Sequence, residues 1–401
     1  SICSVYSLSN FTNPLIEQFG WTSKEVQLTF SLAILFLGLS AAFLGHFVEK
    51  HGPKKAGLLA AGFFGAGMLG AGVAVNMGSL PFLYITYGVL GGIGLGVGYI
   101  APVSTLVKWF PDRRGFATGL AIMGFGFAAA VASPVMDGRI KSVGTANTFF
   151  ILGAAYLIIM TLSSLYLEKP PADWAPEGMK EKAAAGKIKI KQDLAQLTAN
   201  EAVKTSRFYY LWIMLFINVT CGIAILSAAK PLAQESIGLT TAEAATLVGV
   251  LGIFNGLGRL AWASISDYIG RPNTYTIFFV SQIALFLFLP ITKEAILFQI
   301  MLAIVYTMYG GGFSSIPAFI GDVFGTKQLG AIHGYILTAW AAAGLAGPMF
   351  AAWMKDSTGS YASSLTSFAG LFVVALIVSI LIRFDIKKLR KQNEANKRMA
   401  S

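Results

Sequence analysis

The stretch that decides the fold covers residues 56–107, which read AGLLAAGFFGAGMLGAGVAVNMGSLPFLYITYGVLGGIGLGVGYIAPVSTLV. It is 52 residues long and contains no Asp, Glu, Lys or Arg. A helix needs about 20 apolar residues to cross the hydrocarbon core of a bilayer. The stretch is therefore too long for a single crossing. Its middle, Asn76-Met-Gly-Ser-Leu-Pro81, carries a turn signal, so the sequence predicts two membrane-spanning helices joined by a turn.

The whole chain has the same apolar character. Of its 401 residues, 55% are hydrophobic and 12% are charged, whereas soluble domains average roughly 25% charged residues. This composition excludes a soluble enzyme, a disordered protein and a disulfide scaffold. Cys3 and Cys221 are the only cysteines, and we expect both to be packing residues because they make no metal-ligand spacing. The composition indicates a polytopic membrane protein.

Further stretches without charge predict more spans, at residues 26–48, 115–136, 142–167, 208–229, 272–292, 295–321, 328–354 and 357–382. Residues 243–266 form another span, interrupted only by Arg259. Residues 1–16 are uncharged but short, so we expect the chain to begin inside a first helix that lacks its N-terminal part. The predicted fold is an all-α membrane protein with 12 transmembrane helices in two six-helix bundles.

The basic residues of the loops predict the orientation in the membrane. If the N-terminus is inside, 23 Lys and Arg residues lie on the inner side and 6 on the outer side. Inner loops of membrane proteins carry the excess of Lys and Arg, so both termini are expected in the cytoplasm. We expect a multi-pass protein of the plasma membrane, which is the inner membrane in a bacterium. The net charge of +11 then reflects topology and lipid headgroups, and no nucleic-acid partner is expected.

Residues 168–206 contain no span and divide the predicted helices into two groups of six. The predicted organisation is an N-terminal bundle (1–167), a cytoplasmic linker (168–206) expected to be solvated, a C-terminal bundle (207–385) and a basic cytoplasmic tail (386–401).

Similar elements follow the second and eighth spans. An acid and a glycine are three residues apart in both, as Glu49 and Gly52 and as Asp267 and Gly270. Repeated halves are typical of alternating-access transporters.

These features resemble the major facilitator superfamily, with degenerate copies of its loop element at residues 45–55 and 263–272. The segment Lys108-Trp-Phe-Pro-Asp-Arg-Arg-Gly-Phe-Ala-Thr-Gly119 resembles the matching loop of the oxalate/formate antiporter family and the related monocarboxylate transporters. The resemblance covers the whole chain and implies a secondary transporter of small carboxylates. In the resembled family, an arginine of the eighth helix binds the substrate.

Arg259 is the only Asp, Glu, Lys or Arg that lies far from an end of a predicted span. Placing a guanidinium at this depth costs roughly 2.5 kcal/mol or more. Snorkelling would have to cover about seven residues of helix, roughly 10 Å, which exceeds the comfortable reach of the side chain. We therefore expect Arg259 to bind a carboxylate through a bidentate contact.

Other candidate substrate-binding residues follow from position and from the resemblance. Asn255 lies one turn before Arg259. It either bonds the ligand or orients the guanidinium, or it makes an interhelical hydrogen bond. The resemblance places Tyr99 and Tyr309 on cavity-lining helices, Phe313 as an apolar wall one turn after Tyr309, and Leu8 on the first helix as a lid or wall. In animal monocarboxylate transporters the position of Asn255 carries Asp, so proton coupling through that Asp is in doubt here.

The resemblance also bears on substrate charge. The oxalate carrier that typifies the family has a lysine after a Trp-Ala-Ala tripeptide on the eleventh helix. Here the tripeptide at residues 340–342 is followed by Ala343, and the nearest basic residue beyond it is Lys355. We therefore expect a monocarboxylate such as lactate or pyruvate, and keep an oxalate/formate-type exchanger as the alternative.

Proton symport removes the cost of moving an anion inward against a negative potential, and we expect a proton as co-substrate. The candidate proton carriers are the substrate carboxylate itself, Asp137, Glu235 and His333. For His333, the position near a helix end favours a hydrogen-bonded histidine at the membrane interface over a proton carrier. The chain shows no Ser/His/Asp set, metal-ligand cluster or phosphate loop, so we expect no enzyme activity, no cofactor and no metal. A carboxylate sensor is the remaining alternative. We expect a monomer whose other partner is the lipid bilayer.

Overall fold

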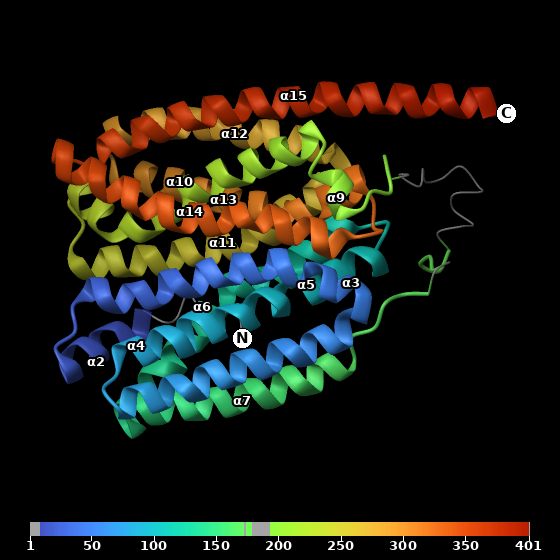
Figure 1. The fold of residues 1–401 in the computed structure, drawn as a ribbon. Coiled ribbons are helices and arrows are strands. Elements are labelled where there is room, and N and C mark those ends of the chain that lie inside the picture. The colour runs from blue at the N-terminus through green and yellow to red at the C-terminus, as the bar shows by residue number, and fades with distance from the viewer. Residues whose placement is uncertain (1–8, 172–173, 179–192, 401) are drawn as a thin grey trace. The chain divides into compact units, whose positions relative to one another are not determined.

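The computed structural model describes residues 9–171, 174–178 and 193–400. Within these ranges the chain is helical and contains no strand (Figure 1). The helices in chain order are α2 (Ser9–Phe19), α3 (Ser23–Asn76), α4 (Leu80–Leu83), η1 (Tyr84–Gly91), α5 (Gly92–Trp109), α6 (Arg114–Val143), α7 (Thr145–Leu165), α9 (Ala199–Ala202), α10 (Ser206–Ile237), α11 (Thr241–Ile269), α12 (Arg271–Phe288), η2 (Leu289–Ile291), α13 (Ala295–Phe324), α14 (Leu329–Thr358) and α15 (Ala362–Ala400).

Helix α3 contains two of the predicted spans. It begins with a capping box, in which the hydroxyl of Thr22 accepts the backbone N–H of Glu25 and the Glu25 carboxylate accepts the backbone N–H of Thr22. Inside α3, Gly52 has a φ of 85°, and Pro53 follows it. A left-handed φ suits glycine, and proline lacks the N–H that the helix would use. These two residues separate the spans predicted on either side of residues 49–55.

The turn predicted at Asn76–Pro81 is confirmed. Helix α3 ends at Asn76, and Ser79 caps the next helix by accepting the backbone N–H of Phe82 at 3.4 Å. The continuous helical run α4–η1–α5 then occupies residues 80–109. A Cβ built on Gly67 would lie 2.6 Å from the backbone nitrogen of Gly91. Glycine therefore lets the two helices predicted from residues 56–107 pack with their backbones in close approach.

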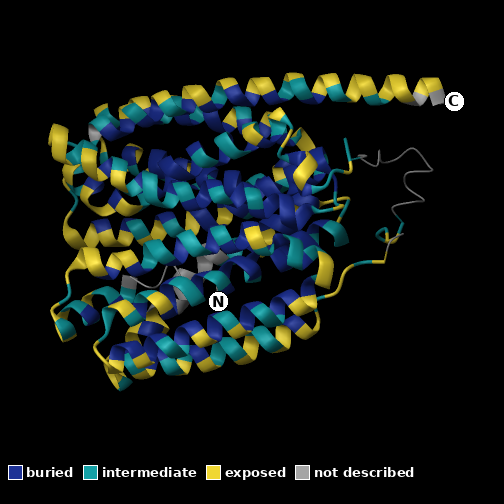
Figure 2. Cartoon of the chain, viewed as in Figure 1, coloured by how far each residue is buried: buried dark blue, intermediate teal, exposed yellow. Residues whose placement is uncertain are grey.

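Among the described residues, nine helical stretches are long and apolar enough to cross a bilayer. One of them is α3, which is bent at Gly52 and supplies two spans. Helices α2 and α6 occupy the positions of the predicted first and fifth spans. Large apolar side chains such as Ile158, Phe288 and Trp353 are exposed. Exposed residues recur along most of the helices (Figure 2). Such surfaces are typical of helices that face lipid. In lipid there is no water to bond polar groups, so each helix satisfies its own backbone and exposes apolar side chains.

The helices cluster into two compact units. The first contains residues 1–105, 124–171 and 330–341, and the second contains residues 106–123, 172–329 and 342–401. The start of α14 belongs to the first unit because Gly334 lies directly against the backbone of Ala41 and Ala42. The start of α6 belongs to the second unit because Gly119 lies against the Arg259 carbonyl oxygen. The division into bundles at residues 168–206 stays a prediction.

Candidate functional site

The candidate site is built around α11 in the second unit. Helix α11 begins with a capping box, in which the Thr240 hydroxyl accepts the N–H of Glu243 at 3.3 Å and the Glu243 carboxylate accepts the N–H of Thr240 at 2.8 Å. It ends at Gly270, which has a φ of 87°. Between these ends the helix is unbroken for 29 residues. Arg259 therefore lies well inside the helix, as the sequence predicts.

The guanidinium of Arg259 is buried and contacts amide, carbonyl and aromatic groups. Its side chain is buried, with 2% of the residue exposed. The Nε atom donates to Asn255 Oδ1 at 3.1 Å, and Nη1 donates to the carbonyl oxygen of Ile122 at 3.2 Å. The Phe313 ring lies 5.5 Å from the guanidinium carbon, within the range of a cation–π contact. The positive charge is thus held inside the protein, where attraction to an anion is stronger than in water.

Asn255 makes the interhelical hydrogen bond that the sequence left open, and it also bonds Arg259. Its Oδ1 accepts the hydrogen bond from Arg259, and its Nδ2 donates to the carbonyl oxygen of Tyr306 on α13 at 3.3 Å. The amide therefore orients the guanidinium and joins α11 to α13 at the same time. The one-turn spacing between Asn255 and Arg259 allows the first contact, and the close approach of α13 allows the second.

A run of three glycines allows α13 to approach this part of α11. A Cβ built on Gly310 would lie 3.0 Å from Arg259 Cγ and closer still to the carbonyl oxygen of Asn255. The hydroxyl of Ser314 donates to the Arg259 carbonyl oxygen at 2.8 Å. A side chain at position 310 would separate the helices and displace the guanidinium. The close approach of α13 is thus what brings Phe313 to Arg259.

Two buried amides next to Tyr309 were not singled out from the sequence. Asn218 on α10 donates to the Tyr309 carbonyl oxygen at 3.3 Å, and Gln282 on α12 donates to Asn218 Oδ1 at 3.2 Å. Both side chains are buried. Uncharged amides inside apolar spans are a signal that could have found them, because buried polar groups need hydrogen-bond partners. They fix α13 to its neighbours at the level of Tyr309.

The structure places four of the six predicted site residues in the second unit. Asn255 and Phe313 both contact Arg259, and Tyr309 is buried one turn before Phe313 on the same helix. Tyr99 belongs to the first unit, where its ring packs against His333 at a centroid distance of 5.4 Å and against Trp340 at 6.5 Å. Leu8 lies outside the described residues. The roles of Tyr99 and Leu8 in substrate binding stay predictions.

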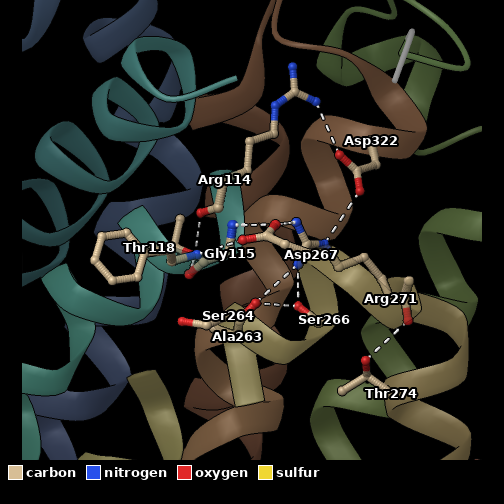
Figure 3. A network of polar contacts seen from close by, with 12 residues as sticks. Arg114, Gly115, Thr118, Ala263, Ser264, Ser266, Asp267, Arg271, Thr274 and Asp322 are labelled. Atoms are coloured by element: carbon tan, nitrogen blue, oxygen red, sulfur yellow. Dashed lines mark hydrogen bonds and ion pairs between the residues drawn. The ribbon is translucent and has the colours of Figure 1, made fainter. Parts of the chain in front are cut away.

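A second polar cluster surrounds Asp267 (Figure 3). The Asp267 carboxylate accepts the backbone N–H groups of Gly115 and Phe116, both at 2.9 Å. It therefore caps the start of α6, where unpaired N–H groups and the helix dipole favour a negative charge. Arg271 forms an ion pair with Asp267 and donates to the Ser266 hydroxyl. The sequence singled out Asp267, but not the N–H groups that it binds.

The equivalent acid of the first half makes the equivalent contact. Glu49 Oε1 accepts the backbone N–H of Gly330, at the start of α14, at 2.7 Å. The glycines three residues after each acid, Gly52 and Gly270, have nearly the same φ, 85° and 87°. The two acids of the sequence repeat therefore have the same structural role, since each accepts backbone N–H groups at the start of a helix in its own compact unit.

The expectation of a solvated linker does not hold for residues 193–197, which contact α6 and α13. Asp193 pairs with Arg114 at 2.7 Å, and Arg114 also pairs with Asp322 at 3.2 Å. The backbone N–H groups of Leu194 and Leu197 donate to carbonyl oxygens at the end of α13, at 3.0 and 2.9 Å. These contacts hold residues 193–197 against α13.

In the part of the chain that the structure describes, no group of three or more His, Cys, Asp or Glu could hold a metal ion.

Residues 1–348 match the profile of the Major Facilitator Superfamily. The chain belongs to this superfamily. The oxalate:formate antiporter of Oxalobacter formigenes is 27% identical to this transporter, with 98% of this chain and 91% of that protein covered. Monocarboxylate transporter 12 of Xenopus laevis is 25% identical, with 77% and 71% covered. The predicted branch of the superfamily is thereby confirmed.

The fold of this superfamily member is shared with solved structures. The fucose:proton symporter of Escherichia coli superposes with a TM-score of 0.71 and covers 95% of this chain and 97% of its own, at 15% identity. The predicted all-α fold of the superfamily is confirmed by this likeness and by the family match. The chain is therefore a multi-pass membrane transporter.

Proposed function

We propose that this transporter carries small monocarboxylates, of the lactate and pyruvate type, by alternating access with a co-transported proton. The observation that carries the proposal is the buried guanidinium of Arg259, held by Asn255 and packed on Phe313. A guanidinium presents five N–H donors in a planar fork that matches a carboxylate. Charge-assisted hydrogen bonds of this kind are about twice as strong as neutral ones. Phe313 supplies an apolar face for the organic part of the substrate.

The charges on α14 support a singly charged substrate. Ala343, which stands where the resembled oxalate carriers have a lysine, is fully buried. The next basic residue on α14, Lys355, pairs with Glu235 and lies 5.1 Å from the Tyr361 ring. Lys355 is thus neutralised at the end of its helix. One buried guanidinium balances one carboxylate and leaves a dianion with an uncompensated charge.

Charge movement supports proton symport. Moving one negative charge inward against a membrane potential costs roughly 2.3 kcal/mol per 100 mV. A proton carried with the anion removes this cost. Among the candidate carriers, Glu235 accepts hydrogen bonds from Lys355, from the Ser360 hydroxyl and from the Tyr361 backbone, and these contacts favour a carboxylate that stays charged. Glu235 is therefore a weaker candidate than the sequence suggested.

The second candidate function is the exchange of one carboxylate for another. It is favoured by the relative of Oxalobacter formigenes, which is an oxalate:formate antiporter and aligns with 98% of this chain. Purified protein in proteoliposomes containing a pH-sensitive dye separates the two functions. We expect saturable uptake of labelled lactate together with acidification of the interior. Robust oxalate exchange without lactate transport would contradict the monocarboxylate proposal.

Replacing Ala343 by Lys tests the basis of charge selection. A second buried cation should favour a dianion, so we expect the ratio of oxalate to lactate uptake to rise about tenfold, which corresponds to about 1.4 kcal/mol. Ala343→Met is the matched control, because Met adds a side chain of similar length without charge. An unchanged ratio in Ala343→Lys, with transport retained, would count against selection by charge balance.

Replacing Asn255 separates orientation of Arg259 from helix packing. Asn255→Asp keeps an acceptor for Arg259 Nε but adds a negative charge that competes with the substrate for the guanidinium. We expect the lactate concentration for half-maximal uptake to rise about tenfold in Asn255→Asp. Asn218→Ala is the control, since Asn218 also bonds a carbonyl of α13 and should lower stability with little change in that concentration. Equal affinity in Asn255→Asp and the wild type would restrict Asn255 to helix packing.

A further inference from the structure

His333 lies in the first turns of α14, in the first compact unit, and is buried with 1% of the residue exposed. Neither of its ring nitrogens forms a hydrogen bond with any residue that the structure describes. The sequence favoured a hydrogen-bonded histidine at the membrane interface, and the structure shows neither the exposure nor the hydrogen bond. Buried polar atoms without partners are rare in proteins and call for an explanation.

The imidazole of His333 is enclosed by α3 and α5. The Tyr99 ring of α5 meets it at a centroid distance of 5.4 Å and an interplanar angle of 60°. On the other side, a Cβ built on Gly334 would lie 3.2 Å from Ala42 Cα and closer to the Ala41 carbonyl oxygen, so α3 and α14 pack backbone to backbone. Trp340, two turns further along α14, packs on the same tyrosine at 6.5 Å. His333 thus sits in an aromatic and apolar enclosure.

Titratable groups of both neighbouring helices contact this part of α14. Tyr99 on α5 meets His333 itself, whereas Glu49 and His46 on α3 contact other residues of α14. Glu49 accepts the N–H of Gly330, one turn before His333, and the His46 ring lies 5.6 Å from that of Tyr335. The basic residues of these helices are Lys24, Lys50, Lys54 and Lys55 on α3 and Lys108 on α5. Glu49 is an acidic group that contacts α14 about one turn before His333, at the predicted cytoplasmic end.

We propose that His333 takes up and releases the proton that accompanies the carboxylate; this inference rests on the proposed proton symport. The step adds one proton to a neutral ring nitrogen and gives an imidazolium, and release reverses it. Imidazole is the side chain whose ordinary titration falls between pH 5 and 8. Enclosure away from water favours the neutral form of an imidazole, and contact with water or an anion favours the charged form. A site whose enclosure changes during the transport cycle can bind and release a proton in turn.

A structural role for His333 makes a different prediction. A histidine that only fills space would affect stability and all modes of transport together. A proton carrier would affect net uptake, which moves protons, but not counterflow, in which loaded carriers exchange labelled for unlabelled carboxylate. The two modes therefore separate the roles.

The test uses His333→Gln in proteoliposomes, with lactate as the probe and an internal pH dye. We expect counterflow within about twofold of the wild type, at least a tenfold loss of proton-driven net uptake, and no acidification. His46→Gln, a histidine variant on the adjacent helix, is the control and should keep proton movement. Net uptake of lactate with its proton in His333→Gln would overturn the inference. If the wild-type protein itself shows counterflow but moves no protons during net uptake, proton symport is overturned. The failure of the symport proposal is thereby distinguished from the failure of the His333 inference.

A second measurement needs no substitution at position 333. The chain contains three histidines, so ring-15N-labelled protein gives few imidazole signals in an NMR spectrum, and the variants His46→Gln and His51→Gln assign the remaining one. We expect lactate to change the protonated fraction of His333 between pH 5 and 8. A His333 signal that stays neutral across this range, with and without lactate, would overturn the inference even if His333→Gln failed to fold.

Discussion

Replacing Arg259 by Gln is expected to lower lactate transport by at least 100-fold while leaving the protein folded. Removing one partner of a buried charge pair costs about 2–5 kcal/mol of binding, and each 1.4 kcal/mol is a factor of ten. Gln keeps most of the side-chain length and can still reach Asn255, so the packing of α11 on α13 should persist. Uptake of labelled lactate into proteoliposomes measures the loss, and the thermal midpoint in detergent reports folding.

Arg259→Lys sharpens this prediction. Lys keeps the charge but presents a point charge in place of a planar fork, so we expect a loss of at least tenfold. Arg383→Gln is the matched control: Arg383, on α15, donates to the Pro272 carbonyl oxygen at 2.9 Å and to the Thr276 hydroxyl at 2.6 Å, away from the Arg259 contacts. It should retain transport. Transport at the wild-type rate in Arg259→Gln would show that Arg259 does not form the anion site.

Asp267→Asn is expected to destabilise the folded protein by about 3 kcal/mol. Breaking a buried ion pair on one side costs about 3–5 kcal/mol. Asp267 and Arg271 have side chains that are 11% and 4% exposed. We expect a loss at the lower end of this range because Asp322, which lies 3.4 Å from Arg271, still pairs with that guanidinium when Asp267 is replaced. The same substitution weakens the cap on the N–H groups of Gly115 and Phe116.

Thermal unfolding in detergent measures the effect of Asp267→Asn, with an expected drop of roughly 5 °C in the midpoint. Asp112→Asn, in the loop that precedes α6, is the control. Its partner Arg113 is 3.9 Å away, and their side chains are 34% and 67% exposed; exposed pairs contribute about 0–1 kcal/mol. Equal midpoints for the two variants would show that the cap and the ion pair of Asp267 do not stabilise the fold.

The helices could be predicted from the sequence because the bilayer imposes a length and a polarity on each span. The turn after Asn76 followed from Gly and Pro signals, which act locally along the chain. The boundary near Gly52 followed from the charged residues between two uncharged stretches. Arg259 is the predicted anion site for a related reason, since a charge deep in a span is costly unless it has a function. Asn255 could be predicted from its one-turn spacing.

The contacts between distant segments could not be predicted. Nothing in the local sequence shows that Asp267 binds the N–H groups of Gly115 and Phe116, because helix-capping partners more than 150 residues away are set by tertiary packing. Asn218 and Gln282 form their amide pair across two helices for the same reason. The docking of residues 193–197 on α13 depends on backbone hydrogen bonds, and these carry no side-chain signal. His333 gave no sign in the sequence that it would be enclosed without a hydrogen bond.

Direct binding of lactate to purified protein tests the anion site most closely, because binding needs no transport cycle. Isothermal titration calorimetry on the wild type and on Arg259→Gln, at matched pH and salt, compares the two. The account predicts saturable binding of lactate by the wild type and none by Arg259→Gln at concentrations 100-fold higher. Equal lactate affinity in the two proteins would contradict it.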